Sequence, residues 1–210
     1  PTDITCHRNY FYQKCFTQDG SKLIFAGEFG PGNAWNYHLL DLNSQVATQL
    51  TDQRGENTFG GFMSPDDLHL YFVRAERQLI RLALADLREE VVYTVPQGWV
   101  GYGTWVSNSA CTNMVGIEIH ADDWFPLSDW KKFHDMYHAK PRCRLIRIDL
   151  ATGQRDVILE KHGWLGHPQY QPFHDETVAF CHEGPHDLVD ARMWFINEDG
   201  GNLRCGKVHR

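Results

Sequence analysis

Short apolar segments alternate with polar turns along the whole chain, and the pattern recurs about every 45 residues. Each repeat has a short apolar strand, a turn rich in Asp, Ser or Gly, and then three further strands. The expected strands are 9–17, 22–28, 35–41 and 45–50, then 57–63, 68–74, 78–84 and 90–96, then 101–106, 113–119, 143–150 and 155–160, and finally 166–172, 177–183, 192–198 and 203–209. The pattern therefore predicts four units of four strands.

A period of this length built from four strands, with helices nearly absent, is typical of a β-propeller. The expected fold class is all-β, and residues 1–210 form a partial propeller with blades over 7–52, 56–98, 99–162 and 163–210. The dipeptide Asp-Leu at Asp41, Asp86 and Asp149 is expected at matching points of three units. A β-sandwich with Greek-key connections is the alternative, but it does not require that recurrence.

The alternation of strand direction sorts the loops onto two faces. The start of each first strand and the loop between the second and third strands share one face, and the turns QDGS, SPDD, SNSA and FHDE lie on the other. First strands line the channel of a propeller. The positions expected on the first face are therefore His7, Arg8, Asn57, Tyr102 and His167, joined by the insertion 120–142 and the segment 182–192.

The string His182-Glu183-Gly184-Pro185-His186 matches the metalloprotease pattern H-E-x-x-H. That chemistry needs both histidines on one face of a helix, and a Gly-Pro pair in the middle opposes a helix. We therefore interpret His182 and His186 as loop residues that face the channel and contact substrate, or that bond to a backbone carbonyl. A G-x-S-x-G elbow, a P-loop and a G-x-G-x-x-G turn before a helix are all absent from the sequence.

Arg192 follows this loop at the start of an expected strand. Its guanidinium could bind a carboxylate in a bidentate manner, or form a salt bridge to Asp187 or Asp190. His7 and Arg8 are adjacent at the start of a first strand, so only one of the two should face the channel.

The insertion carries aromatic side chains among Asp, Lys and His. Its length and composition suit a lid or a sugar platform, although packing between blades could also account for them. The aromatic residues are Trp124, Trp130, Phe133 and Tyr137.

A formal net charge of -7 argues against nucleic acid or an anionic membrane as a partner. An acidic ligand would need a local cationic cluster to overcome that charge. No stretch of the sequence is apolar enough for a membrane span. The six cysteines show no CxxC pair and predict buried free thiols rather than disulfides. Because the chain begins at Pro1 without a Met, we expect residues upstream of it.

Several long strings resemble the oligogalacturonate lyase family in order along essentially the whole chain. They are TCHRNYFYQ, NTFGGFMSPDD, WVGYGTW, DWKKFH, WLGHP and CHEGPHDLVDARMWFINEDG. The resemblance implies a seven-bladed cytoplasmic propeller that acts on short pectin fragments such as digalacturonate with a divalent metal, manganese. The implied reaction is β-elimination, in which the C5 proton of a galacturonate is removed and the C4–oxygen bond breaks.

The resemblance also implies which residues act. An arginine of the family neutralises the uronate carboxylate, which allows removal of the C5 proton by a histidine base. The arginine of the string HDLVDAR falls on Arg192, which becomes the candidate catalytic residue. His7, Arg8, His167, His182 and His186 are the candidate substrate contacts. The base and the metal ligands are expected beyond Arg210, so no metal ligand is assigned here and this chain alone is expected to be inactive.

Two other functions fit the repeat pattern. One is a non-catalytic propeller that serves as a binding module. The other is the propeller half of a prolyl-oligopeptidase-type hydrolase, which predicts a G-x-S-x-G elbow downstream of Arg210.

Overall fold

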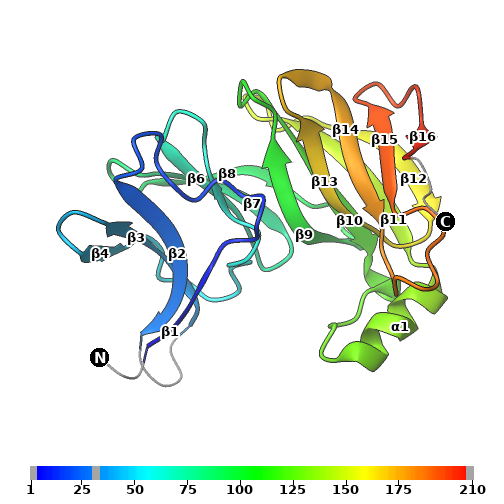
Figure 1. The fold of residues 1–210 in the computed structure, drawn as a ribbon, viewed down its shortest axis with the longest axis horizontal. Helices are drawn as coiled ribbons and strands as arrows, with labels where there is room; N and C mark the ends of the chain where they lie inside the picture. The colour runs from blue at the N-terminus through cyan, green and yellow to red at the C-terminus, as the bar shows by residue number, and fades with distance from the viewer. Residues whose placement is uncertain (1–3, 30–33, 207–210) are drawn as a thin grey trace. The chain divides into compact units, whose positions relative to one another are not determined.

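The computed structural model of the chain describes residues 4–29 and 34–206. They form four four-stranded antiparallel sheets, each made of four consecutive strands in meander order, as predicted (Figure 1). The first two sheets consist of β1 Ile4–Arg8, β2 Lys22–Phe29, β3 Asn36–Asp41, β4 Val46–Gln49, β5 Phe62–Met63, β6 His69–Arg74, β7 Gln78–Ala83 and β8 Glu89–Thr94. The other two consist of β9 Trp99–Ser107, β10 Asn113–His120, β11 Arg142–Asp149, β12 Arg155–His162, β13 Leu165–Gln171, β14 His174–His182, β15 Met193–Asn197 and β16 Arg204–Cys205.

The chain divides into two compact units, Pro1–Thr94 and Val95–Arg210. In the first unit, apolar side chains from both sheets form one buried cluster, because every second residue of a strand points to the same face. Tyr37 is fully buried there, and its hydroxyl donates to the carbonyl of Asn57 at 2.6 Å and accepts from the N–H of Gly61 at 2.8 Å. A side chain at Gly61 would collide with that hydroxyl.

The second unit buries a larger cluster between its two sheets, with Val115, Leu145, Leu165 and Phe180 among its members. The first strands of the two sheets, β9 and β13, pack against each other, as neighbouring blades of a propeller do. Helix α1, Trp130–Ala139, also contributes Met136 to this core.

The first strand was predicted wrongly. Strand β1 is Ile4–Arg8 and pairs with Phe25–Phe29 of β2, whereas residues 9–14 leave the sheet and residues 15–17 return to bond with Lys22–Ile24 of β2. The reason lies in two polar side chains of that segment. Asn9 donates to the carbonyl of Gly61 at 2.6 Å, and Gln13 donates to the carbonyl of Gly60 at 2.5 Å. These bonds hold the segment against the next sheet, so it cannot continue as a regular strand.

Gly20, Asp67 and Cys111 each lie two residues before the second strand of their sheet in the left-handed conformation, and each N–H donates to the carbonyl three residues back. The fourth turn differs from the prediction FHDE, because β14 already begins at His174 and residues 172–173 form a two-residue hairpin with Phe173 left-handed. Asp19 and Asp66 brace two of these turns by accepting from Ser21 and Leu68 two residues on.

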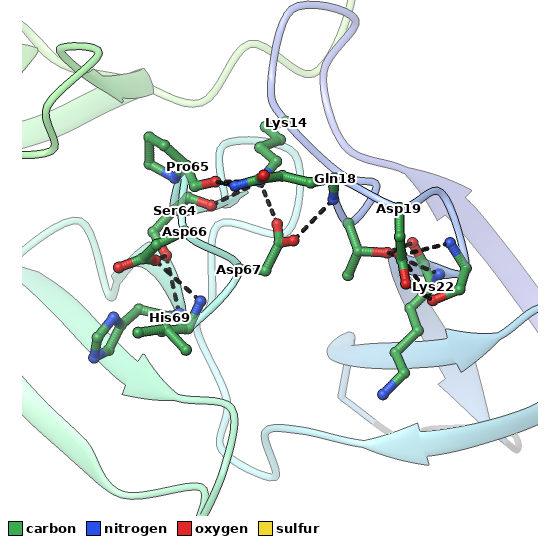
Figure 2. A network of polar contacts seen from close by, with 12 residues as sticks. Lys14, Gln18, Asp19, Lys22, Ser64, Pro65, Asp66, Asp67 and His69 are labelled. Carbon is green, nitrogen blue, oxygen red and sulfur yellow. Dashed lines mark hydrogen bonds and ion pairs between the residues drawn. The ribbon is translucent and has the colours of Figure 1, made fainter.

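Neighbouring turns are bonded to each other. Figure 2 shows Lys14 donating to the carbonyls of Ser64 and Pro65 and pairing with Asp67, which also accepts from the backbone N–H of Gln18. In the second unit, the N–H of Ser109 donates to Asp175 at 3.0 Å. These contacts join adjacent sheets at the end predicted for the four polar turns.

The Asp-Leu marker recurs at only two matching points. Asp41 and Asp149 each end a third strand and accept backbone N–H groups of the following turn. Asp86 lies three residues beyond the end of β7 at Ala83, where it accepts only from Arg88. The equivalence expected for Asp86 was therefore wrong, although the four-sheet prediction did not depend on it.

The insertion 120–142 contains the helix that the strand pattern did not predict. Asp129 caps α1 by accepting from the N–H of Lys132 at 2.8 Å, and Lys140 ends it in the left-handed conformation. Trp124, Phe133 and Tyr137 pack against the core of the second unit, whereas the side chain of Trp130 is 64% exposed. Packing therefore accounts for three of the four aromatic residues.

The thiols were predicted correctly in one respect only. All six cysteines are free, but Cys143 is the buried one, and Cys6 and Cys205 are exposed.

Candidate active site

The candidate site lies in the second unit, where the loop 183–192 connects β14 to β15 (Figure 1). The carboxylate of Glu183, only 6% exposed, lies between the side chains of His167 and Arg192. One of its oxygens is 2.9 Å from Nε2 of His167, and the other is 3.5 Å from the guanidinium of Arg192. The structure thus brings Arg192 and His167, both predicted site residues, onto one carboxylate.

Arg192 is held by its own loop but is still open to solvent. Its guanidinium donates to the carbonyl of Gly184 at 2.5 Å, and its side chain is 37% exposed. A guanidinium has five N–H donors, so these contacts leave others for a ligand. The salt bridge to Asp187 or Asp190 considered from sequence is absent among the described residues, and Glu183 takes that place.

The backbone conformation at His167 directs its side chain toward Glu183. His167 has a positive φ of 51°, and the pairing of β13 with β14 shifts register between Gly166 and Gln169. A β-bulge of this kind redirects a side chain, and bulges with left-handed non-glycine residues concentrate at functional sites. A Cβ on Gly166 would lie 2.7 Å from Cγ of Glu183, so only glycine leaves room for the carboxylate.

Helix α1 contacts the loop 183–192 through Tyr137. The hydroxyl of Tyr137 donates to the carbonyl of Leu188 at 2.7 Å, and the ring lies against Gly184, which has a φ of 140°. A side chain at Gly184 would be strained by that φ and would collide with the ring. The insertion and the segment 182–192 therefore meet, as the face assignment predicted.

The H-E-x-x-H string has no metalloprotease geometry. His182 ends β14, and residues 183–191 form turns and bends without a helix. Within the described ranges, no group of three His, Cys, Asp or Glu side chains could hold a metal ion. Glu183 binds Arg192 and His167 instead of serving as a metalloprotease base.

His182 is the last residue of β14, and its ring contacts two other side chains. Its Nε2 is 3.1 Å from Nζ of Lys161, and its ring stacks on Trp194 with centroids 4.6 Å apart. Burial, followed by the nearby charge of Lys161, lowers the pKa of His182 to about 4. His182 is thus a neutral imidazole at neutral pH.

The other predicted contacts lie apart from this cluster. His186 is exposed in the loop. His7 and Arg8 belong to the first unit, inside β1 and not at the entry to a strand. The ring of His7 stacks on Phe59, with centroids 4.1 Å apart, and contacts Trp35, whereas Arg8 is exposed. The adjacent residues His7 and Arg8 thus have different surroundings, and the expectation that only one of them faces the channel stays a prediction.

Sequence reasoning missed Glu183. The N–H of His182 donates to the carbonyl of Arg192 at 2.9 Å, so the β14–β15 register places His182, and not Glu183, opposite Arg192. A hairpin aligned from its two apolar strands would therefore not have suggested Glu183 as the partner of the arginine.

Comparison with known proteins decides the family. The family model described as oligogalacturonate lyase matches residues 1–210. The chain belongs to the oligogalacturonate lyase family. An oligogalacturonate lyase of Dickeya dadantii is 65% identical over 210 residues, which cover all of this chain and 53% of that protein. An oligogalacturonide lyase of Pectobacterium atrosepticum is 63% identical with the same coverage.

Solved structures agree with that assignment. An oligogalacturonate lyase in complex with manganese is 67% identical and superposes with a TM-score of 0.95, covering all of this chain and 55% of the other. A β-propeller domain of Myceliophthora thermophila Cps50 is only 13% identical but has a TM-score of 0.54 over 91% of this chain and 56% of its own, which supports the propeller fold alone. The chain spans about half the length of the oligogalacturonate lyases it matches. No helix in the described part is long and apolar enough to cross a membrane.

Proposed function

We propose that the protein is a lyase that cleaves short oligogalacturonides such as digalacturonate by β-elimination. Membership of the oligogalacturonate lyase family supports the reaction, and the two curated relatives bear that name. The observation that carries the proposal is Arg192, whose half-exposed guanidinium is anchored by the carbonyl of Gly184 and by Glu183.

β-Elimination from a galacturonate requires a cationic group beside the carboxylate of the sugar. The C5 proton of a galacturonate is weakly acidic, and its removal places negative charge on the adjacent carboxylate as an enolate-like transition state forms. A fixed guanidinium stabilises that charge more than it stabilises the ground state, because its donors are already oriented. The electron pair released at C5 forms the C4–C5 double bond, and the glycosidic oxygen leaves C4.

Glu183 gives Arg192 its orientation. A carboxylate that is 94% buried cannot move far, and the guanidinium beside it keeps one edge toward the protein and another toward solvent. His167 binds the opposite oxygen of Glu183, so we assign it a positioning role rather than that of the base. The base stays the family histidine expected beyond Arg210.

A divalent metal is proposed for the whole enzyme, because a solved relative is in complex with manganese. The described residues do not supply a ligand set for it. We assign neutralisation of the carboxylate to Arg192, the residue on which the arginine of the family string falls. A cytoplasmic location is proposed as well, and the six free thiols are consistent with a reducing compartment.

The test is Arg192→Lys in the full-length protein, assayed by the ultraviolet absorbance of the unsaturated product from digalacturonate. Lysine keeps the charge but loses the planar fork, so kcat should fall at least about a hundredfold. Arg204→Lys is the matched control, since Arg204 is exposed on β16 of the same sheet, and it should keep wild-type kcat. An Arg192→Lys enzyme with undiminished kcat refutes the assignment. If the wild-type protein binds digalacturonate but releases no unsaturated product, the result favours a non-catalytic binding module over a lyase.

A further inference from the structure

A pocket of about 370 Å³ opens in the second unit beside the loop 183–191. Its wall includes the ends of β12 and α1, the loop itself and the ring of Trp194 on β15. Glu183 and Ala191 also line it, and these are the ion-pair partner and the chain neighbour of Arg192. The pocket therefore adjoins the candidate site and shares Glu183 with it.

Lys161 is the half-buried lysine in the wall of this pocket. Its ammonium donates to Nε2 of His182 at 3.1 Å and lies 5.9 Å from the ring centroid of Trp194. Within residues 4–29 and 34–206, no carboxylate comes within ion-pair distance of it. Partial burial lowers the pKa of Lys161, as expected where a charge has lost water without gaining a counter-ion.

The other polar groups of the wall are also donors. Trp164 is 3% exposed, and its indole N–H has no acceptor among the described residues. Lys140 and His162 add further nitrogen donors at the edge. Of the two acids in the wall, Glu183 is already bound to His167 and Arg192, and Asp190 is exposed at the rim. A negatively charged ligand rich in acceptors would suit the ammonium of Lys161 and the nitrogen donors at the edge.

The aromatic part of the pocket wall suits a sugar ring. Trp194 and His182 stack at an interplanar angle of 28° and present flat apolar surface next to the ammonium. A hexuronate combines a C–H face, which packs on an aromatic ring, with a carboxylate on its edge. Inorganic phosphate would use the ammonium but leave the aromatic surface without a partner.

We propose that this pocket is a second uronate-binding subsite, in which Lys161 binds the carboxylate of a galacturonate unit adjacent to the unit at Arg192. The inference rests on the proposed function, since it assumes an oligogalacturonide. Two carboxylates of one substrate would then be held by two separate cations, Arg192 at the reacting unit and Lys161 at its neighbour. This arrangement would supply the local positive charge that an acidic ligand needs on a chain of net charge -7.

The experiment compares Lys161→Gln with wild type in the full-length protein. Steady-state assays with digalacturonate should show a KM raised about tenfold and a kcat within about twofold of wild type. This is the effect expected from the loss of one charge-assisted contact. Calorimetry should show the same tenfold loss of affinity for digalacturonate and none for neutral digalactose. Lys161→Arg should restore most of the affinity. Lys131→Gln, which alters an exposed lysine of α1, should match wild type in every assay.

The outcomes separate the subsite from the lyase. An active wild type with an unchanged Lys161→Gln variant overturns the subsite and leaves the lyase proposal standing. An equal loss of affinity for acidic and neutral disaccharides also overturns it, since a structural role for Lys161 would produce that result. An inactive wild type with a selective loss of digalacturonate binding refutes the lyase and supports an acidic-sugar pocket.

Discussion

At the scale of single residues, Glu183 organises the candidate site. Its buried carboxylate faces His167 on one side and Arg192 on the other, and Gly166 and Gly184 leave room for it and for the ring of Tyr137. A buried charge is costly unless it is paired, so removal of Glu183 would affect both the position of Arg192 and the stability of the loop. Arg192 could be chosen from sequence, whereas its partner Glu183 depended on the conformation of the loop after β14.

His182 gives the fold a dependence on pH. Its pKa of about 4 in the folded chain lies below the ordinary value near 6.5. The unfolded chain therefore takes up the proton first as the pH falls, and the folded state loses stability between about pH 6.5 and 4. We expect His182→Gln to reduce this loss in urea unfolding curves measured across that interval.

His174→Gln is the control for this prediction. His174 is exposed at the start of the same strand, so its replacement should leave the pH dependence of the free energy of unfolding unchanged. Parallel curves for wild type and His182→Gln would show that the imidazole titrates normally in the folded chain.

At the scale of elements, helix α1 braces the functional loop. The strand repeat accounts for the sheets, but this helix arises from a local signal, the cap at Asp129 and a run of helix-compatible residues. Met136 anchors it in the core and Tyr137 bonds to Leu188. The aromatic content was compatible with a lid, a sugar platform or packing, and three of the four aromatic residues pack against the core of the second unit.

Loss of the helix cap should be measurable. Asp129→Ala removes the acceptor for the N–H of Lys132 and should lower the free energy of unfolding by about 1 kcal/mol in urea denaturation. Asp135→Ala removes only an exposed i,i+4 pair with Lys131 and should cost less than about 0.5 kcal/mol. Equal effects of the two substitutions would mean that the cap does not stabilise the helix.

At the scale of the whole molecule, charge and thiol chemistry set the general behaviour. The net charge of -7 disfavours polyanions, so the proposed binding of an acidic sugar requires local cations, for which we propose Arg192 and Lys161. The six thiols stabilise nothing covalently, and the two units depend on their own apolar cores.

The thiols should differ widely in reactivity. Burial raises the pKa of Cys143 to about 12, and the thiolate is the reactive form, so Cys143 should be alkylated last in the native protein. Exposed Cys205 should react early, and all six should react in denaturant without a reductant. Mass spectrometry of timed iodoacetamide reactions checks this, and a disulfide-linked peptide in the unreduced sample would contradict it.

The sequence by itself determined the four-sheet all-β organisation and the choice of Arg192. Strand periodicity and turn chemistry are local properties, and long matching strings identify a family. Only the tertiary structure decided that β1 is Ile4–Arg8, that Asp86 has no equivalent role, and that Glu183 joins His167 to Arg192. It also decided that Lys161 faces a pocket without a counter-ion among the described residues. These features depend on strand register and on contacts between sheets, where side chains distant in sequence meet, and no local pattern specifies them.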